Sequence, residues 1–590
     1  MAKRGFIFST IRQKRVKRNA FNLSYENKLT CNMNRLVPFF VNDVLPADSF
    51  KVFNEYLMKC QPLIAPIMHR VDIYQHYFYV PLRLIWRDFE LFITGGKDGS
   101  AVVNHPFITC GLFNSFLTTL STQYTAWYSD ASGKSEYVQN DTNSLWAVFK
   151  DTLSKYNSLL YLLDYLGYPF SKNEGISTEY NSDNDYTAYT FTPMDDSEHF
   201  SSLRIRAYFF IYDNYYIDEN LGTQCFSDAW KNNNGSDNSF LSSYVFSNGY
   251  VKRRAWKKDY FTSALPFLQR GYAPNVPTDV SFQMSENGNR VLGIDNQYVS
   301  ADENINIDAY TNEDTYQTGE GKLVGVGADE YEYNNLHIDN SSDLVVNFDI
   351  NTLRRANALQ RWLEKNARSG ARYVEQVLSH FGIRPKDYRL DRPEYLGGGK
   401  QPFTVSEVVQ TSETSDTPQA NQAGNGHGYN QQHVFNQTFE EHGLIIGLLS
   451  VMPRASYQQG LSRLLTKFDK LDYAFPEFGN LGEQEVLSKE LFFTKDGSSA
   501  NDNVFGYQSR YAEYKYNFDQ VHGDFKDSLK FWHLGRIFEN RPLLNESFVA
   551  SDASKRVFAV EDEDEDCLLF DFYNNVTVLR ALPAYGTPAL

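Results

Sequence analysis

Seven basic side chains in the first 18 residues are the densest cluster of one chemistry in this sequence. They are Lys3, Arg4, Arg12, Lys14, Arg15, Lys17 and Arg18. No acid lies among them, so the net charge of −17 divides into +7 for this arm and −24 for the rest of the chain. Lys and Arg neutralise phosphates, and the interleaved Phe6, Phe8 and Ile11 could pack against protein or bases. The arm, residues 1–20, therefore predicts a nucleic-acid contact. A disordered tail with incidental charge is the alternative.

Motifs for nucleotide, metal and covalent chemistry are incomplete. Gly397–Lys400 resembles a phosphate loop, but Glu394 stands where its first glycine is required and Gln401 where Ser or Thr is required. We interpret it as a turn between strands. No HExxH pair or GxSxG elbow occurs, and no two carboxylates stand out as a glycosidase pair. We therefore expect no catalytic residue, no metal site and no cofactor, and a protein that is not an enzyme.

A run of six acids, Glu561–Asp566, is the remaining charged feature. Clustered oxygen ligands bind hard cations such as calcium. Adjacent carboxylates converge on one ion only where a turn is imposed on them, so we favour a solvated acidic loop.

Cysteine usage and hydropathy fit synthesis in a reducing cytoplasm. The five cysteines (Cys31, Cys60, Cys110, Cys225 and Cys567) are scattered without CxxC spacing, which argues against a disulfide framework or a zinc ribbon. The basic N-terminus is not followed by the apolar run of a signal peptide. The longest apolar stretch, Leu444–Met452, is far shorter than the roughly 20 residues of a membrane helix. It predicts a buried strand.

Strand-like runs are short and widely separated. Aromatic residues are abundant, with 40 Tyr and 44 Phe, and they favour strands and interfaces. The β-branched and aromatic runs at 71–80, 204–212, 344–348, 403–409, 444–451 and 577–579 predict strands. Long polar segments separate them, which indicates one β framework with large loops rather than a compact α/β enzyme.

Two helices and three irregular segments complete the organisation. Apolar residues recur at helical spacing over Asn351–Phe381, with a break at Ser369-Gly370. A second helix is predicted over Asn143–Leu166, before Gly167 and Pro169. The segments 174–197, 225–250 and 273–342 are predicted to be exposed and irregular.

Ordered blocks along nearly the whole chain carry a family resemblance. They include FNLS at 21–24, VLPADSF at 44–50, YFYVPLRLIWRDF at 77–89, RAYFFIYDNYYIDEN at 206–220, RPEYLGGG at 392–399, FGYQSRYAEY at 505–514 and LPAYGTPAL at 582–590. Each block alone is weak, but their order is specific. In this respect the chain resembles the major capsid proteins of the Microviridae, bacteriophages with single-stranded DNA, particularly the gokushovirus-like branches. Ile217 and Ala47 depart from the residues that relatives often carry, which leaves the branch open.

The resemblance implies a mainly β fold: an eight-stranded antiparallel jelly roll with long loop insertions and a few helices, in one capsid domain over 21–590. It implies a T=1 icosahedral shell of sixty copies around a single-stranded DNA genome, with 273–342 as the candidate surface protrusion and 174–197 as its rival. The implied partners are the chain itself, the genome, a host surface receptor, a small basic DNA-packaging protein, and minor spike, pilot or scaffolding proteins, without membrane insertion. The implied location is the virion, and the host bacterial cytoplasm during assembly.

Two other classes of protein fit part of the pattern. A secreted β-sandwich that binds or degrades carbohydrate would explain the acids and tyrosines, but not the basic arm. A nucleic-acid-binding protein outside the capsid class would need a basic folded body, whereas this body carries −24. Only a capsid protein predicts particles of megadalton mass.

Overall fold

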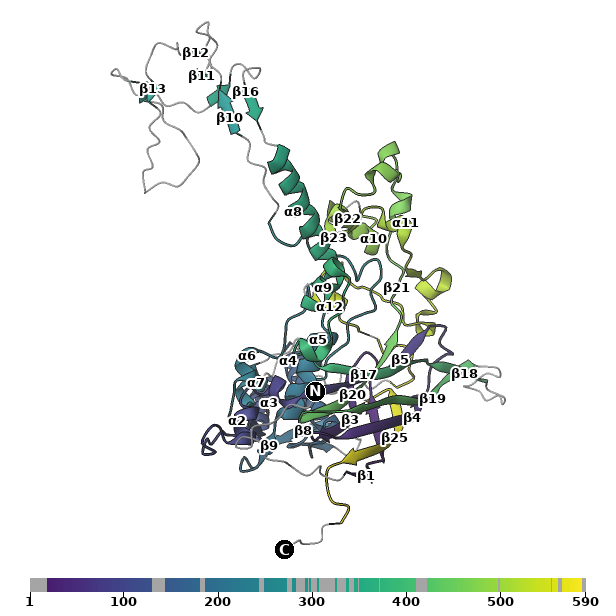
Figure 1. Ribbon diagram of the computed structural model, residues 1–590. Coiled ribbons are helices and arrows are strands. Elements are labelled where there is room, and N and C mark those ends of the chain that lie inside the picture. Colours follow the sequence, from purple (N-terminus) through teal and green to yellow (C-terminus); the bar gives the residue numbers. More distant parts are fainter. Residues whose placement is uncertain are drawn as a thin grey trace. The chain divides into compact units, whose positions relative to one another are not determined.

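The computed structural model describes residues 18–129, 144–180, 186–243, 249–272, 350–370, 372–409, 422–496, 499–552, 554–560 and 565–585 (Figure 1). Between 273 and 349 it describes only the backbone of short strands. The chain divides into two compact units, one of Met1–Leu268 with Gly370–Leu590 and the other of Gln269–Ser369. Helix and strand take nearly equal shares, the sheets are mostly antiparallel, and the described residues form no closed barrel.

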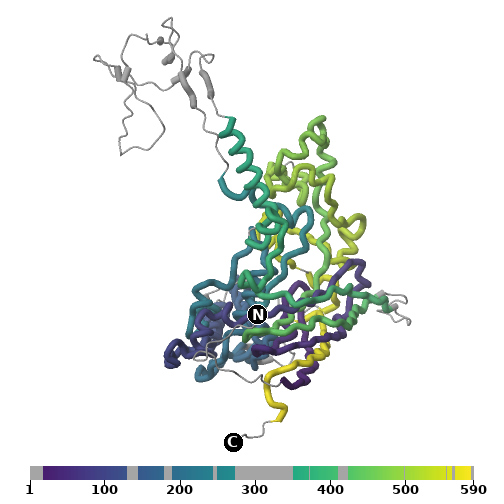
Figure 2. The backbone as a smooth tube through the Cα atoms, viewed as in Figure 1, coloured from purple at the N-terminus to yellow at the C-terminus, as the bar shows by residue number. Residues whose placement is uncertain are grey.

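A six-stranded antiparallel sheet is the first layer of the larger unit. Its strands are β1 (Asn19–Asn22), β2 (Tyr25–Cys31), β4 (Ser49–Cys60), β18 (Thr404–Val409), β19 (Gln422–Thr438) and β25 (Leu568–Arg580). They lie in the order β1-β25-β4-β19-β18, and β2 also pairs with β25. In Figure 2 the yellow C-terminal strand therefore runs beside purple N-terminal ones. Burial alternates along β4 and β25, so this sheet covers one face and leaves the other open.

A four-stranded antiparallel sheet is the second layer. It comprises β3 (Val37–Val44), β5 (Val71–Pro81), β17 (Glu394–Pro402) and β20 (Gly443–Pro453), in the order β17-β5-β20-β3. Every residue of β20 is buried, because strands flank it on both sides and side chains cover both faces. The buried strand predicted at Leu444–Met452 is confirmed.

The core lies between these two layers and is largely aromatic. Phe39 of β3 stacks on Phe572 of β25 with ring centres 4.5 Å apart. Tyr77 of β5 meets Phe435 of β19 at 6.1 Å. Ring pairs of this kind add about 0.5–1.5 kcal/mol beyond the area they bury. The inner faces of the two sheets are thus joined along their length.

A chain of buried amides also crosses from one sheet to the other. Asn54 donates to Asn574 at 2.8 Å within the first sheet. Gln75 of the second sheet donates to Asn54 at 2.9 Å, and Gln432 donates to Gln75 at 2.8 Å. Buried amides are costly when unsatisfied, so these bonds favour a single alignment of the two sheets.

Five of the six predicted strands are confirmed, including the one at 344–348, which is β16 (Leu344–Asn347). The prediction for 204–212 is wrong, because these residues belong to helix α5 (Leu203–Tyr215). Nine residues of α5 are buried, so the helix has no polar stripe from which a period of 3.6 could be read. Its aromatic and β-branched composition is then typical of a strand, which explains the wrong prediction.

The remaining helices are shorter or lie at the ends of the sheets. In the larger unit they are α1 (Leu82–Ile85), α2 (Phe89–Thr94), α3 (Gly111–Ser129), α4 (Ser144–Tyr165), α6 (Asp228–Lys231), α7 (Asn238–Ser243), α9 (Tyr373–Phe381), α10 (Ser488–Leu491), α11 (Ala512–Lys515) and α12 (Glu546–Val549). Those from α2 to α7 gather at one end of the two sheets (Figure 1). Helix α4 confirms the prediction over Asn143–Leu166, although Asn143 itself lies outside the described residues.

A buried ion pair explains why the segment 225–250 is not an exposed loop. The side chains of Arg206 and Asp237 are both fully buried and joined by two hydrogen bonds of 2.7 Å. Asp237 precedes α7, so the pair fixes this segment against α5. Trp230 is also fully buried. The prediction of an exposed, irregular segment was wrong here, since a charge-assisted pair between distant residues draws it into the core.

Short two-stranded sheets complete the larger unit: β6 (Phe107–Thr109) with β9 (His199–Ser201), β7 (Ile176–Tyr180) with β8 (Tyr186–Phe191), β21 (Ser456–Tyr457) with β24 (Asp519–Gln520), and β22 (Glu483–Leu487) with β23 (Val504–Ser509). The hairpin β7–β8 corrects the prediction that 174–197 is irregular throughout. Among its described residues, 192–193 and 195–197 are both irregular and exposed. A second small core around Phe261, Tyr457 and Phe505 lies beneath β22 and β23.

The smaller unit holds the predicted insertion. Its described backbone pairs β10 (Asp279–Phe282) with β16, β11 (Leu292–Ile294) with β12 (Gln297–Tyr298) and β15 (Leu336–Ile338), and β13 (Ile305–Asn306) with β14 (Val324–Gly325). The other residues of 273–342 lie outside the described part of the chain. Helix α8 (Ile350–Ser369) ends at the predicted break, and α9 begins after Gly370, whose φ is +98°.

Two carboxyl groups meet at the start of α9. Glu219 and Glu375 both accept a hydrogen bond from the backbone N–H of Arg372, at 3.1 and 3.4 Å. The Arg372 guanidinium lies 2.7 Å from Glu219 and 3.6 Å from Glu375. Burial, the hydrogen bond with Glu219 and the negative charge of Glu219 raise the pKa of Glu375 from 4.5 to about 7. One proton is therefore shared here near neutral pH.

This pair predicts a pH-dependent stability. The pKa of Glu375 is higher in the folded than in the unfolded chain, so its contribution is present below pH 4.5 and is lost as the pH rises through about 7. Glu375→Gln keeps a hydrogen-bonding group but cannot ionise. We expect it to raise the free energy of unfolding at pH 8 by about 1 kcal/mol, a value discounted because the group is partly exposed, and to flatten the profile between pH 5 and 8. Thermal unfolding across this range measures it, with the exposed Glu485→Gln as control. A profile as steep as that of the unchanged chain would contradict the shared proton.

Candidate assembly surface

Residues 462–482, here called the assembly segment, cross the surface without joining a sheet. Three short turns of 3-10 helix form it: η4 (Arg463–Leu465), η5 (Lys470–Asp472) and η6 (Pro476–Phe478). Ser462 and Asp469 cap the first two with their side-chain oxygens, and Pro476 begins the third. Local capping therefore gives this segment its shape.

Two cationic side chains of the assembly segment point inward, whereas Asp469, Lys470, Asp472 and Glu477 are exposed. The Lys467 Nζ lies 3.0 Å from Glu513 and 4.0 Å from the ring centre of Tyr514, and its side chain is only 4% exposed. Arg463 lies 3.3 Å from Glu490, a buried carboxylate. Each cation thus neutralises a buried or partly buried acid, which secures the segment to the body of the larger unit.

Electrostatics at these anchors follow from burial and pairing. Burial raises the pKa of Glu490. Burial also opposes the charge of Glu513, but hydrogen bonds from Gln484 and Lys467 outweigh it and hold the pKa of Glu513 below its ordinary value. The Glu513 carboxylate is therefore ionised at neutral pH.

The apolar side chains of the same segment point outward. Phe468, next to the buried Lys467, is 91% exposed. Seven further large apolar side chains are more than one third exposed: Leu464, Leu465, Leu471, Tyr473, Phe475, Phe478 and Leu481. Burying each of them would contribute about 1.5–3 kcal/mol. Such a patch marks an interaction surface.

Sequence reasoning missed this surface. The segment reads LSRLLTKFDKLDYAFPEFGNL over 461–481, dense in large apolar residues but without a period of 2 or 3.6. Apolar density without periodicity, interrupted by Pro476 and Gly479, was the available signal. It points to apolar residues that no helix or strand of the same chain can bury.

The predicted nucleic-acid residues lie almost entirely outside the described residues. This applies to Lys3, Arg4, Arg12, Lys14, Arg15 and Lys17. Arg18 is described, is exposed and stands directly before β1. The arm therefore begins at the edge of the six-stranded sheet, and its role stays a prediction.

The glycine run at Gly397–Lys400 is not a turn, contrary to our interpretation. It lies within β17 and pairs with β5 after a bulge between Tyr395 and Gly397. A Cβ on Gly398 would lie 2.2 Å from the carbonyl oxygen of Gln75, so close approach of the strands requires glycine there. The Lys400 Nζ lies 2.7 Å from the buried Asp72.

Of the acidic run, Glu561–Glu563 and Asp564 lie outside the described residues, while Asp566 accepts hydrogen bonds from Thr30 at 2.7 Å and Asn32 at 3.0 Å. It therefore secures the end of β2 beside β25. All five cysteines are buried and free. Within the described ranges no three His, Cys, Asp or Glu side chains approach as metal ligands would. No helix of those ranges combines the length and apolarity needed to cross a membrane.

Comparison with known proteins gives the family directly. Residues 9–120 and 174–590 match the family model described as capsid protein (F protein). The chain is 33% identical to capsid protein VP1 of Chlamydia phage 1, over 99% of this chain and 97% of that protein. It is 28% identical to capsid protein VP1 of Bdellovibrio phage phiMH2K and 26% identical to that of Spiroplasma virus 4, with the same coverage.

These matches confirm the resemblance to microvirus capsid proteins and favour a structural role over the carbohydrate-binding alternative. A capsid protein contacts neighbouring subunits, so an exposed apolar surface such as the assembly segment is expected in this family. The chain belongs to the phage capsid protein (F protein) family and is a structural protein of the virion.

Proposed function

We propose that sixty copies of this chain assemble into a closed T=1 icosahedral shell around a single-stranded DNA genome. Family membership supports the capsid role, and the assembly segment is the observation that carries self-assembly. Arg463 and Lys467 are paired inside the subunit, and eight large apolar side chains are exposed among a few charged ones, so what the segment offers to a partner is mainly apolar. Obligate interfaces between copies are of this kind and bury more than about 2,000 Å².

We also propose that residues 21–590 form one elaborated domain whose frame is an eight-stranded jelly roll. The order β2-β25-β4-β19 in one sheet and β3-β20-β5-β17 in the other supports it. Most successive strands of this set lie in opposite sheets, as the two Greek keys of a jelly roll require. The helices, the assembly segment and the smaller unit are then insertions between these eight strands.

Replacing two exposed apolar side chains of the assembly segment by serine should prevent shell formation without unfolding the subunit. Leu465→Ser with Phe468→Ser removes two exposed apolar side chains, each contributing about 1.5–3 kcal/mol when buried. We expect the variant to sediment as small species at concentrations where the unchanged chain forms particles. Its thermal midpoint should stay the same, because neither side chain is in the core.

Val102→Ser is the matched control, since Val102 is 92% exposed outside the assembly segment. It should leave particle formation unchanged. Normal particles from the double variant would show that the segment is not an intersubunit contact.

We propose that the basic arm faces the shell interior and binds genome phosphates without reading sequence. Replacing Arg12, Lys14, Arg15, Lys17 and Arg18 by Ala should lower the DNA content of particles, with a difference that is largest at low salt, where phosphate contacts contribute most. Ultraviolet absorbance of purified particles measures the DNA content. The charge-conserving set Arg12→Lys, Arg15→Lys and Arg18→Lys is the control and should package normally. Unchanged DNA content in the Ala variant would refute this role.

We propose that the insertion 273–342 protrudes from the shell and contacts a host receptor. Its Asn, Asp, Gly and Tyr content supports exposure, and Tyr on loops suits recognition. Replacing 273–342 by a short Gly/Ser linker should leave particles intact while host attachment falls sharply. A linker in place of 411–420, between β18 and β19, is the control. Loss of particles would make the insertion part of the shell, and normal attachment would place recognition elsewhere.

Other partners and the site of assembly are inferred from the family alone. We propose a small basic DNA-packaging protein and minor spike, pilot or scaffolding proteins as further components. Assembly in the host bacterial cytoplasm fits the five free cysteines. Co-purification from infected cells tests these partners, and particles containing only this chain would argue against them.

A further inference from the structure

The open face of the six-stranded sheet has a defined array of side chains. The registers place Tyr429 of β19 beside Leu57 of β4, then Asp571 of β25 and Lys28 of β2. Two residues along, Gln431 and Glu55 lie beside Tyr573 and Glu26 in a second row, and Phe53 lies between His433 and Asn575 in a third. All of these side chains lie on the face away from the second sheet.

Aromatic rings on this face remain partly or largely exposed among the described residues. Tyr429 is 63% exposed and Tyr573 40% exposed. Phe53 packs edge-on against His433 at 4.9 Å, with the Lys51 ammonium 5.1 Å from its ring centre. Rings on an open sheet, with cations among them, are the arrangement on which unpaired bases stack in single-strand binding proteins.

The charge on this face is balanced, so the attraction for a polyanion must come from elsewhere. Lys28, Lys51 and Lys59 are offset by Glu26, Glu55 and Asp571. The arm of seven cations begins at Arg18, and the next residue, Asn19, pairs with Arg580 of β25. The arm is therefore tethered to the edge of the same sheet and can supply the missing positive charge.

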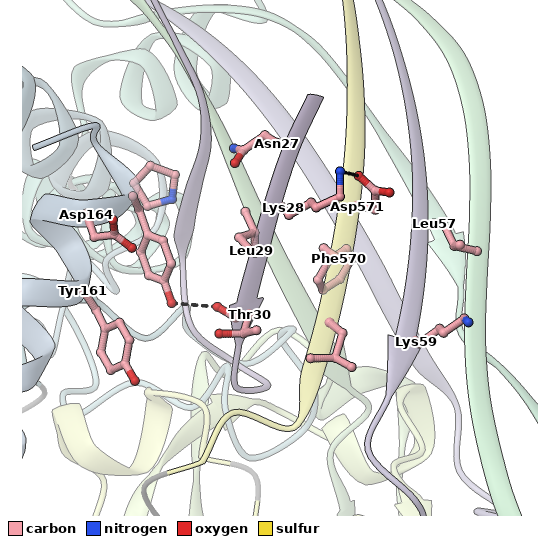
Figure 3. Close-up of a pocket in the computed structure, with 13 residues that line it drawn as sticks. Asn27, Lys28, Leu29, Thr30, Leu57, Lys59, Tyr161, Asp164, Phe570 and Asp571 are labelled. Atoms are coloured by element: carbon pink, nitrogen blue, oxygen red, sulfur yellow. Dashed lines mark hydrogen bonds and ion pairs between the residues drawn. The ribbon is translucent and has the colours of Figure 1, made fainter. Parts of the chain in front are cut away.

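A pocket of 570 Å³ lies at the far end of the open face (Figure 3). Leu57 and Lys59 line it from β4, Thr30 from β2, and Tyr161 and Asp164 from α4. Its volume is within the range of about 300–1,000 Å³ found for small-molecule sites, so a nucleotide unit could enter. The face thus ends in a hollow rather than in a flat edge.

We propose that the open face of the six-stranded sheet, with Tyr429 and Tyr573 as its central rings, is a stacking platform for the bases of single-stranded nucleic acid. This rests on the proposed packaging of single-stranded DNA and names the surface that takes part in it. Every base has a π-face, so such a platform tolerates any sequence. A second copy of the chain is the competing occupant, and the experiment below separates the two.

The full-length chain is titrated with a fluorescent oligothymidylate at several salt concentrations. Tyr429→Ser and Tyr573→Ser should each weaken binding about tenfold, because stacking contributes about 1–3 kcal/mol per base. Their slope of log affinity against log salt should equal that of the unchanged chain, since no phosphate contact is lost. The arm variant should show the opposite result, with a shallower slope.

Two further variants control for folding and for general loss of a tyrosine. Tyr429→Phe and Tyr573→Phe keep the ring and should restore affinity. Tyr388→Ser removes a tyrosine that is 47% exposed outside this sheet and should bind normally. Thermal midpoints of all variants show whether the subunit remains folded.

Affinity of the Ser variants equal to that of Tyr388→Ser would overturn the platform. So would loss of particles on sedimentation with unchanged oligothymidylate affinity, because a second copy would then occupy this face. If the unchanged chain forms no particles but the Ser variants still lose affinity selectively, the proposed shell fails and the platform stands.

Discussion

The one-sided burial of the six-stranded sheet is the constraint on which the rest of the structure depends. Strands β4 and β25 alternate between buried and exposed residues over their length. The buried set packs against the second sheet through pairs such as Phe39–Phe572, and the amide bridge from Gln75 to Asn54 joins the layers. A shift of either strand by one residue would exchange the two sets and turn the aromatic core outward. The strand register that buries one set of side chains therefore also leaves the alternate set exposed, and this set forms the open face.

The distribution of apolar and cationic side chains in the assembly segment is the reverse of that in the sheets. In the sheets apolar side chains face the core, whereas in residues 462–482 Lys467 is inside and Phe468 outside. The anchoring ion pairs cost desolvation, so they hold position more than they stabilise. These ion pairs hold the exposed apolar side chains in position in the isolated subunit. Apolar groups fixed in advance lose less conformational entropy on association, which would suit the repeated contacts of the proposed shell.

Specific polar contacts help to hold the insertions between strands, beside the apolar core that they share with the sheets. Arg206 and Asp237 join α5 to the segment before α7, and Arg372 gathers Glu219 and Glu375 where α9 begins. Both clusters link residues distant in sequence, so each insertion closes back on the domain that carries it. The first is fully buried, while the second holds a carboxyl whose pKa is about 7.

The sequence by itself determined those features that local pattern expresses. It located β5, β16, β18, β20 and the end of β25, the helix over Asn143–Leu166, and the break at Ser369-Gly370, because alternation, helical spacing and glycine conformation are local properties. The ordered motifs also identified the family. Only the tertiary structure decided that 204–212 is a helix, since a helix buried all round carries no amphipathic period. It likewise decided that 225–250 is held inside by Asp237, that Gly397–Gly399 stand within a strand, and that the apolar residues of 462–482 face outward. Each of these depends on a partner far along the chain, and a local pattern cannot specify which distant surface will cover a side chain or leave it exposed.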